Sequence, residues 1–413
     1  MIKYFTTGMS SSVIDLSQAD VTETGVTSPK TVDEVNQSAN SIPENCIILG
    51  MNMTIPWNNP HNLISLEAEL LFDRIKATIL VPLVFLIGFP TNCINMAVFF
   101  KQGLKERINL CLFSLALVDL LCLTFSFAFH AERLYTEFTD GQRIGAVYRY
   151  VVNNNILGLY GIVYGPMFLT VIVSIERCIC ILFPLRAQRC IPTKAIAFTI
   201  VIGVSGLVFA RFAVTAMYEV RCFYEMRTQR VSWQNYVNDY YFRNKAMINA
   251  LNSAFYGFFL TIGCPIIVLI TTIITSIRLT QIVRWRSQTS SSLSSKEIGV
   301  TKMLIALSIE FFVLSIPIMA LRVVPLFEPR LRAGGVFANS FNFLMSFAEF
   351  FSNLSSTVNF FVYYFTGTKY KETLQGLLAR RASPKSTTKS ESDLTAIVTN
   401  SLTYVDQATG SRM

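Results

Sequence analysis

The chain has 413 residues, of which 52% are hydrophobic and only 15% are charged, and its mean hydropathy is +0.45. This balance is too apolar for a soluble multidomain protein and predicts a membrane protein. The formal net charge of +9 does not indicate nucleic-acid binding, because the lysines and arginines are spread between apolar stretches instead of forming a patch.

The residue types that metal sites and most enzymes need are scarce in this sequence. The chain has two histidines, His61 and His130, and its nine cysteines show no metal-ligand spacing. It contains no Gly-rich phosphate loop, no nucleophile elbow and no HExxH motif. We therefore expect no metal, no cofactor and no enzymatic activity.

Residues 1–74 are polar and lack the basic start and apolar core of a cleaved signal peptide. This composition predicts a disordered N-terminal tail. Asn36 and Asn52 each begin an N-glycosylation sequon, a pattern that permits modification without requiring it.

Seven long apolar stretches follow this tail. Each reaches the roughly 20 residues that a helix needs to cross about 30 Å of hydrocarbon. Backbone polar groups in lipid must bond within their own segment, so we expect an all-α membrane protein, a bundle of seven transmembrane helices. The stretches are Ile75 to Phe100, Ile108 to His130, Val147 to Phe183, Ala195 to Met217, Ile248 to Ile277, Met303 to Val324 and Val336 to Phe365.

The connections between these stretches predict the orientation. The first, third and fifth connections, and the segment after the seventh stretch, are rich in lysine and arginine. By the positive-inside rule they lie in the cytoplasm, with the N-terminus outside and the C-terminus inside. We expect a multi-pass protein of the plasma membrane, surrounded by membrane lipid.

The fourth connection, Glu219 to Lys245, is rich in aromatic residues such as Trp233 and Tyr241. Aromatic side chains beside membrane helices form either an interfacial belt or a lid over a ligand pocket. The sequence leaves both interpretations open.

Asp119 lies near the middle of the second stretch and hence near the bilayer centre. A carboxylate there costs about 2.5–3.5 kcal/mol on insertion scales, so it should face the bundle interior. Asn92 in the first stretch and Asn359 in the seventh are its expected partners. Such a polar network either has a function or only holds helices together.

Short motifs along the chain resemble, in order, the helix signatures of rhodopsin-like G-protein-coupled receptors. The resemblance spans Ile75 to about Leu374, where Phe365 to Leu374 resembles a short amphipathic eighth helix. It implies a receptor domain over residues 75–374 that binds an extracellular ligand and activates a heterotrimeric G protein. The motifs are Gly88-Phe-Pro-Thr-Asn92, Ser114-Leu-Ala-Leu-Val-Asp119-Leu-Leu, Ser174-Ile-Glu176-Arg177-Cys178 with Pro184-Leu185, Pro265, Phe311 with Pro317, and Asn359-Phe-Phe-Val-Tyr363.

The resemblance also implies an activation switch. Arg177 would meet the G protein when the bundle opens, and Glu297 would pair with Arg177 at rest. A partly buried charge pair can bias such a helix movement. Alternatively, Glu297 pairs with Lys302 in solvent. The switch residues are Glu176, Arg177, Glu297, Asn359 and Tyr363.

Several positions depart from the family pattern. Ser315 stands where the family usually carries a tryptophan, and Phe360 replaces the proline of the helix-seven motif. Glu310 lies deep in the sixth stretch, where it is either protonated or part of the polar network with Asn92 and Asp119.

The disulfide pattern departs as well. The cysteine that the family usually carries at the outer end of the third helix is replaced by Val152, so the usual bridge cannot form. Cys222 in the fourth connection then needs another explanation in an oxidising compartment. One hypothesis is a Cys46–Cys222 disulfide, and the alternative is a free or intermolecular thiol.

The positions that often line the ligand pocket of the family match His130, Leu159, Arg322 and Glu349. Leu159 replaces the amine-binding aspartate and Asn353 the retinal lysine, which argues against monoamine receptors and opsins. A pocket with both charge signs would suit a peptide or a zwitterionic small molecule. The polar members could instead be interfacial anchors.

Residues 375–413 form the expected cytoplasmic tail, which is rich in serine and threonine. Ser383 follows two arginines, a pattern typical of basic-directed kinase sites, and Ser386, Thr387 and Thr388 could also accept phosphate. A receptor kinase would then create an anionic patch for arrestin. The alternative is an unmodified, solubilising tail.

The sequence is similar to invertebrate neuropeptide-type receptors and to related chemosensory groups, so the ligand is a neuropeptide, which we favour, or a small polar odorant. A seven-helix channel or transporter is the alternative from another class. Transporters usually show internal repeats or paired broken helices, and this sequence shows neither.

Overall fold

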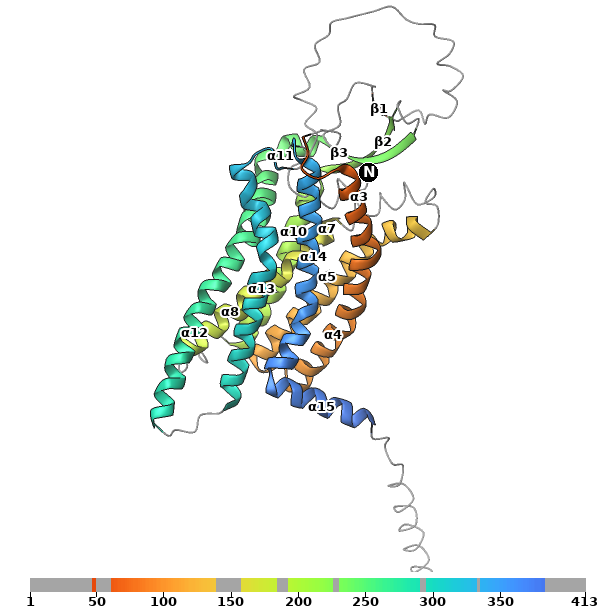
Figure 1. Ribbon diagram of the computed structural model, residues 1–413. Coiled ribbons are helices and arrows are strands. Elements are labelled where there is room, and N and C mark those ends of the chain that lie inside the picture. Colours follow the sequence, from red (N-terminus) through yellow and green to blue (C-terminus); the bar gives the residue numbers. More distant parts are fainter. Residues whose placement is uncertain are drawn as a thin grey trace, which may run out of the picture.

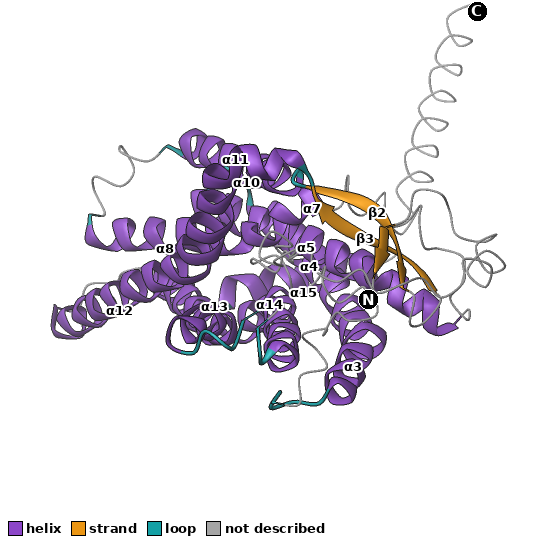
Figure 2. Ribbon diagram, turned by 90° about the horizontal axis from the view of Figure 1, so that it is seen from above, coloured by secondary structure: helices purple, strands orange, loops and turns teal. Residues whose placement is uncertain are grey.

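The computed structural model describes residues 47–49, 61–138, 157–183, 192–225, 230–289, 295–332 and 335–382. Its helices run roughly side by side, with a small three-stranded sheet at one end and helix α15 at the other (Figure 1). We call these ends the sheet side and the α15 side. Seen from above, the strands lie toward one edge of the bundle (Figure 2).

Among the described residues, seven helical segments cross the molecule, and several are composite. The number of residues per turn changes where an α-helix continues as a π-helix or a 3₁₀-helix. The side chains that follow are therefore rotated about the helix axis. The segments are α3–η4–α4 (Leu66–Ile75, Lys76–Leu80, Val81–Gln102), α5 (Arg107–Phe138), α7–η6–α8 (Leu157–Leu159, Tyr160–Tyr164, Gly165–Leu182), α10 (Thr193–Thr215), α11–η7–α12 (Asp239–Asn249, Ala250–Gly263, Cys264–Thr289), α13 (Ser295–Phe327) and α14 (Ala338–Thr366); α15 (Thr368–Ala382) follows.

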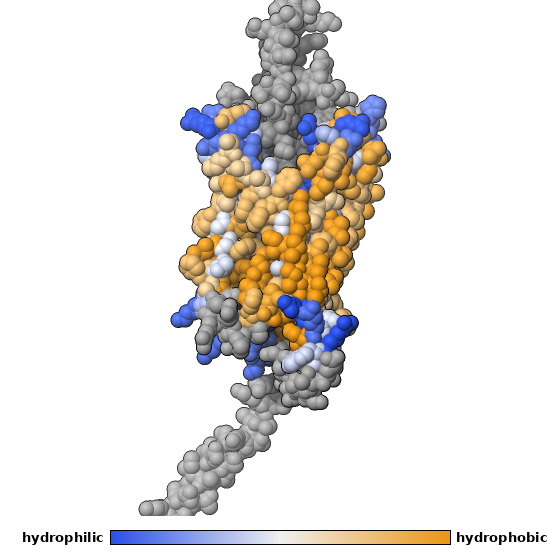
Figure 3. Space-filling model, turned by 90° about the vertical axis from the view of Figure 1, so that its left-hand side faces the viewer, coloured by the Kyte–Doolittle hydropathy of each residue, from blue (hydrophilic) through white to orange (hydrophobic). Residues whose placement is uncertain are grey.

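On the face shown in Figure 3, a hydrophobic band lies between two hydrophilic ends of the bundle. Among the described residues, six helices are long and apolar enough to cross a membrane. Helix α14 is the seventh, with 29 residues, and buries polar side chains such as Asn339, Ser346 and Asn359 inside the bundle. These lower its hydropathy while leaving it packed against α4, α5 and α13. The predicted seven-helix fold is confirmed.

The first and the eighth helix extend beyond the limits that the sequence predicted for the receptor domain. The first helix begins at Leu66 rather than Ile75, because the Ser65 side chain caps it by accepting a hydrogen bond from the backbone of Ala68. Its first turns are too polar for a hydropathy signal. The eighth helix, α15, continues to Ala382, well past the predicted end at Leu374.

The fourth connection contains two strands and the start of a helix. Strands β2 (Tyr218–Glu225) and β3 (Arg230–Val237) form an antiparallel hairpin, and β1 (Ile47–Leu49) adds to β2 in parallel. Helix α11 follows, with the Asn238 side chain as its N-cap. Apart from Tyr218 and Glu219, the hairpin side chains lie outside what the structure describes, so the choice between belt and lid stays open.

Close contact among the first, second and seventh helices depends on Gly88. A Cβ atom at this position would clash with the Thr357 hydroxyl of α14 and with a Leu123 methyl of α5. Glycine therefore lets the helix backbones approach, as small residues commonly do in membrane bundles. This approach brings the polar residues of α4, α5 and α14 within hydrogen-bond distance.

Candidate ligand cavity and polar network

A cavity opens in the sheet-side half of the bundle, with about 790 Å³ of empty space when its solvent-open part is included. The predicted residues His130, Arg322 and Glu349 all line it, from α5, α13 and α14. The structure therefore gathers three of the four sequence-predicted pocket residues around one space. Aromatic side chains from the third helix, Tyr160 and Tyr164, complete the wall.

Leu159, the fourth predicted pocket residue, does not line this cavity. Its side chain is 37% exposed on the outside of the bundle. The chain passes from α7 into the 3₁₀ segment η6 at the next residue, and the tighter helix turns Tyr160 and Tyr164 inward instead.

Glu349 already has a cationic partner. Lys76 Nζ lies 3.0 Å from Glu349 Oε2 and 3.6 Å from Asp73 Oδ1, and it donates a hydrogen bond of 3.0 Å to Ser346. The Lys76 side chain is only 1% exposed. Lys76 was not among the predicted site residues, although a lysine beside the start of the first apolar stretch was a usable signal.

Arg322 differs from Glu349 because it forms no ion pair with the described residues. Its Nε atom is buried without a hydrogen-bond partner. The ionisable groups that act on it are Tyr160, Tyr164 and Arg211, none of which is a carboxylate. This wall of the cavity therefore carries positive charge that the described part of the chain does not neutralise.

Arg211 is a second buried arginine, which the sequence analysis also missed. It is 1% exposed, donates to Asn252 Oδ1 at 2.9 Å and lies 5.4 Å from the centre of the Tyr256 ring. Its own Nε has no partner among the described residues. An arginine in the apolar stretch Ala195 to Met217 was the signal that could have found it.

His130 and Asn353 form the polar part of the cavity floor. His130 Nδ1 lies 2.8 Å from the Ser126 carbonyl oxygen, which can only accept, so Nδ1 donates. The other ring nitrogen, Nε2, is buried without a partner in the described structure. Asn353 donates to the Ser126 hydroxyl at 2.8 Å and so joins α14 to α5 beneath the cavity.

In the loop between α13 and α14, Arg330 has a carboxylate partner, unlike Arg322. Arg330 donates to both carboxylate oxygens of Glu328, at 2.7 and 2.8 Å. These hydrogen bonds hold the pKa of Glu328 at about 2. Arg330, in the loop, thus has a counter-ion, whereas Arg322, whose Nε is buried, has none among the described residues.

A buried polar network lies about one helical turn beyond the cavity floor. Asp119 accepts hydrogen bonds from the Ser356 hydroxyl at 2.7 Å and from Asn359 Nδ2 at 2.8 Å. Of the two predicted partners, Asn359 therefore bonds to Asp119 and Asn92 does not. Asn92 instead donates to the Ser356 carbonyl at 2.8 Å, because its side chain points along α4 toward the α14 backbone.

This network continues to α15 through residues that the sequence analysis did not single out. Asn95 donates to Asn92 Oδ1 at 3.4 Å, and the Tyr370 hydroxyl donates to Asn95 Oδ1 at 2.6 Å. Burial raises the pKa of Tyr370, so its hydroxyl keeps the proton that it donates. Asn95 follows Asn92 by three positions, the spacing that places both on one helix face.

Glu310 and Tyr363 border this network without joining it. Both carboxylate oxygens of Glu310 are buried and lack a hydrogen bond of ordinary geometry within the described residues, although the Ser355 hydroxyl is nearby. The Tyr363 hydroxyl is also buried and unpartnered there. Its ring packs edge-on against Phe99 at 5.2 Å between centroids. These groups are free to form new bonds in another conformation.

A family model described as "Serpentine type 7TM GPCR chemoreceptor Srw" matches residues 80–381, well over half of the chain. The chain belongs to this family of serpentine receptors. It is therefore a multi-pass membrane protein of the G-protein-coupled receptor type, and the family is one of receptors rather than enzymes. No curated protein sequence matches the receptor significantly.

At the α15 side of the receptor, Arg177 pairs with its own neighbour. Its Nε and Nη2 donate to the two carboxylate oxygens of Glu176 at 2.5 and 2.7 Å. Arg107 Nε lies 3.6 Å from the same carboxylate, which is 3% exposed. The Glu297 side chain lies outside the described residues, so the Arg177–Glu297 pair stays a prediction.

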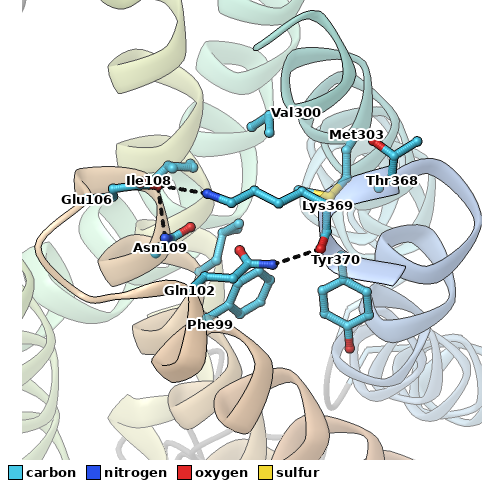
Figure 4. Close-up of a pocket in the computed structure, with 12 residues that line it drawn as sticks. Phe99, Gln102, Glu106, Ile108, Asn109, Val300, Met303, Thr368, Lys369 and Tyr370 are labelled. Carbon is cyan, nitrogen blue, oxygen red and sulfur yellow. Dashed lines mark hydrogen bonds and ion pairs between the residues drawn. The ribbon is translucent and has the colours of Figure 1, made fainter. Parts of the chain in front are cut away.

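The receptor has a second, smaller cavity at this end, with about 400 Å³ of empty space (Figure 4). Lys369 of α15 lies 3.2 Å from Glu106, in the loop between α4 and α5, and Gln102 donates to the Lys369 carbonyl at 3.4 Å. Met303 of α13 closes one side. These contacts hold the start of α15 against the end of α4.

The remaining predicted site residues of the receptor lie outside the described residues: Asn36, Asn52, Cys46, Ser383, Ser386, Thr387 and Thr388, together with the side chain of Cys222. The residues that follow the two cysteines are described. Ile47 of β1 pairs with Phe223 of β2. In the described part of the chain, no group of three or more histidine, cysteine, aspartate or glutamate residues could hold a metal.

Proposed function

We propose that the receptor is chemosensory: it binds a small polar molecule in the sheet-side cavity and activates a heterotrimeric G protein at the α15 side. The family supports a chemosensory role more directly than the neuropeptide role that the sequence alone favoured. A peptide ligand remains the second candidate, and the same experiment distinguishes the two.

The observation that carries this proposal is the row of polar residues on α14. Glu349 and Asn353 line the cavity, while Ser356 and Asn359 bond to Asp119 in the network that leads to α15. Their spacing of three or four residues places all four on one face of the helix. A small movement of α14 on ligand binding would therefore change both sites together.

Activation would follow a shift between two conformations rather than a chemical step. A ligand shifts such an equilibrium only by as much as it binds one state better than the other. In the open state we expect Arg177 to leave Glu176 and contact the G protein. Buried groups that lack partners here, such as the Tyr363 hydroxyl, are candidates for new contacts in that state.

The proposed orientation places the sheet side outside the cell and α15 in the cytoplasm, as the positive-inside rule predicts. We also propose a domain organisation of an N-terminal tail, the receptor domain and a cytoplasmic tail, with its boundaries moved to Leu66 and Ala382. Glycan attached to Asn36 or Asn52, removed by treating intact cells with an amidase, would support this orientation. A receptor kinase and arrestin acting on the tail around Ser383 would end the signal.

The test is G-protein activation in cells with the receptor at the surface, challenged separately with small polar odorants and with neuropeptides. A response to an odorant that disappears in Arg177→Ala would support the proposal. A response only to peptides would show that the ligand is a peptide and not a small polar odorant. A ligand-evoked current that persists without G proteins would contradict the receptor mechanism and favour a channel.

A further inference from the structure

The charges around the sheet-side cavity are not balanced in the same way on its two walls. On the α14 wall, Lys76 already neutralises Glu349 at 3.0 Å. On the α13 wall, Arg322 has neither an ion pair nor a bond to its Nε within the described residues. Taking a charge out of water without a partner is strongly unfavourable, so native proteins rarely keep one.

The surroundings of Arg322 make this imbalance larger. Arg211 is the other charged group that acts on it, and two positive charges repel each other across a medium of low dielectric constant. Arg211 bonds to Asn252 and lies over Tyr256, so it has polar and aromatic contacts but no counter-ion in the described structure. Tyr160 and Tyr164 contribute phenol hydroxyls, which can donate hydrogen bonds, and no carboxylate.

We propose that the ligand is an organic acid with one carboxylate, which binds in this cavity and pairs with Arg322. The inference rests on the proposed function and adds the chemical class of the ligand. A guanidinium group presents two parallel N–H donors that match the two oxygens of a carboxylate. The ligand would thus supply the counter-ion that the described part of the chain does not provide.

A single negative charge fits the cavity better than a double charge or a cation. Arg322 offers one uncompensated positive charge in the cavity lining, and a dianion such as a phosphate monoester would also face the Glu349 carboxylate across the cavity. A cationic ligand would have to displace Lys76 from Glu349 while approaching Arg322. The uncharged remainder of the ligand would contact Phe129, Met167 and Ile318, which are apolar.

Binding can be tested without a G protein, on the purified full chain in detergent. Thermal unfolding would be followed with a panel of aliphatic, hydroxy and aromatic monocarboxylic acids, each beside its primary amide, its amine analogue and sodium chloride at equal ionic strength. A ligand that binds only the folded state raises the unfolding temperature. We expect at least one acid to do so and its amide, its amine and chloride to fail.

Two variants make the test specific to Arg322. Arg322→Gln should weaken binding of the acid by about 10- to 100-fold, the range for losing a charged hydrogen-bond pair. The control is Arg332→Gln, which changes an exposed arginine of the α13–α14 loop and should leave the affinity for the acid unchanged. Without ligand, Arg322→Met should raise the unfolding temperature or leave it unchanged, because it removes an uncompensated charge. A lower unfolding temperature would show that Arg322 has a structural partner and would overturn the proposal.

The remaining outcomes separate this inference from the proposed function. Acid binding that depends on Arg322, without any G-protein response in cells, would support the anion site and contradict the receptor function. A G-protein response to amines or neutral compounds, with no stabilisation by any acid of the panel, would support the receptor function and overturn the anion site. Equal stabilisation by chloride would also overturn it, since the site would then hold a simple ion.

Discussion

Lys76 Nζ lies 3.0 Å from Glu349 Oε2, and this ion pair joins the first and seventh helices inside the bundle. Asp73 Oδ1 is also 3.6 Å from the same ammonium group, so Lys76 interacts with two carboxylates. Glu349, in contrast, pairs with one cation among the described residues. The two partners are therefore not equivalent. The pair also neutralises the only carboxylate that lines the sheet-side cavity among the described residues, which leaves Arg322 as its uncompensated charge.

Lys76→Gln is expected to lower the unfolding temperature more than Glu349→Gln. The first change leaves Asp73 and Glu349 without their shared cation, whereas the second leaves Lys76 its contact with Asp73. Removing one partner of a buried pair costs about 3–5 kcal/mol, and the retained contact should reduce this for Glu349→Gln. Thermal unfolding in detergent measures both, and the double variant should recover part of the loss. Equal effects of the two single changes would refute the shared-cation arrangement.

At Asp119, we expect Asn to be tolerated and Ala to be harmful. Asp119→Asn keeps an acceptor for Asn359, and the Ser356 hydroxyl can rotate to accept from the new amide, so the unfolding temperature should be unchanged or higher. Asp119→Ala leaves the Asn359 amide buried without its acceptor, at a cost of about 1–3 kcal/mol. If Asp119→Asn proved as destabilising as Asp119→Ala, the negative charge itself would be required, which would indicate a bound cation.

The hydroxyl of Tyr370 should hold α15 against the bundle. Tyr370→Phe keeps the ring packed on Phe99 but removes the hydrogen bond to Asn95, so amide hydrogen exchange within α15 should become faster. Tyr364→Phe is the matched control, because no hydrogen bond of its hydroxyl to a described residue is present. An exchange rate in α15 that is the same in both variants would show that packing alone fixes this helix.

Two glycine substitutions should change the unfolding temperature in opposite directions. Gly88→Ala forces a methyl group against Thr357 and Leu123, and overpacking of this kind costs about 1–3 kcal/mol. Gly206→Ala meets no atom within 4 Å and should gain up to about 1 kcal/mol from helix propensity. Unfolding temperatures compare the two. Stabilisation by Gly88→Ala would contradict the close packing of α4, α5 and α14.

A Cys46–Cys222 disulfide should appear in a peptide map of the protein made without reducing agent. Ile47 and Phe223, the residues that follow these cysteines, pair in parallel between β1 and β2, which is compatible with such a link. Cys46→Ser and Cys222→Ser should then give the same phenotype, and the double variant should add nothing. Recovery of both cysteines as free thiols would remove the hypothesis.

The fold could be predicted from the sequence because the apolar stretches that specify membrane helices are local features of the chain. Seven apolar stretches of membrane length specify seven helices, since backbone groups in lipid can bond only within a helix. The same reasoning located Asp119, because a carboxylate in an apolar stretch must find buried partners. It failed at Leu159, where a 3₁₀ turn changes which side chains face inward, and at Leu66, where a capped polar helix precedes the apolar stretch.

The sequence by itself determined the number of membrane crossings and the residues that could not face lipid. Hydrophobicity and helix length are properties of each segment alone and do not depend on the helices packed beside it. Only the tertiary structure decided which of these residues meet. The pairing of Lys76 with Glu349 and the absence of a described partner for Arg322 depend on helix rotation and on distances between segments far apart in the chain. Charge balance in a cavity is a property of that arrangement, and no single helix contains it.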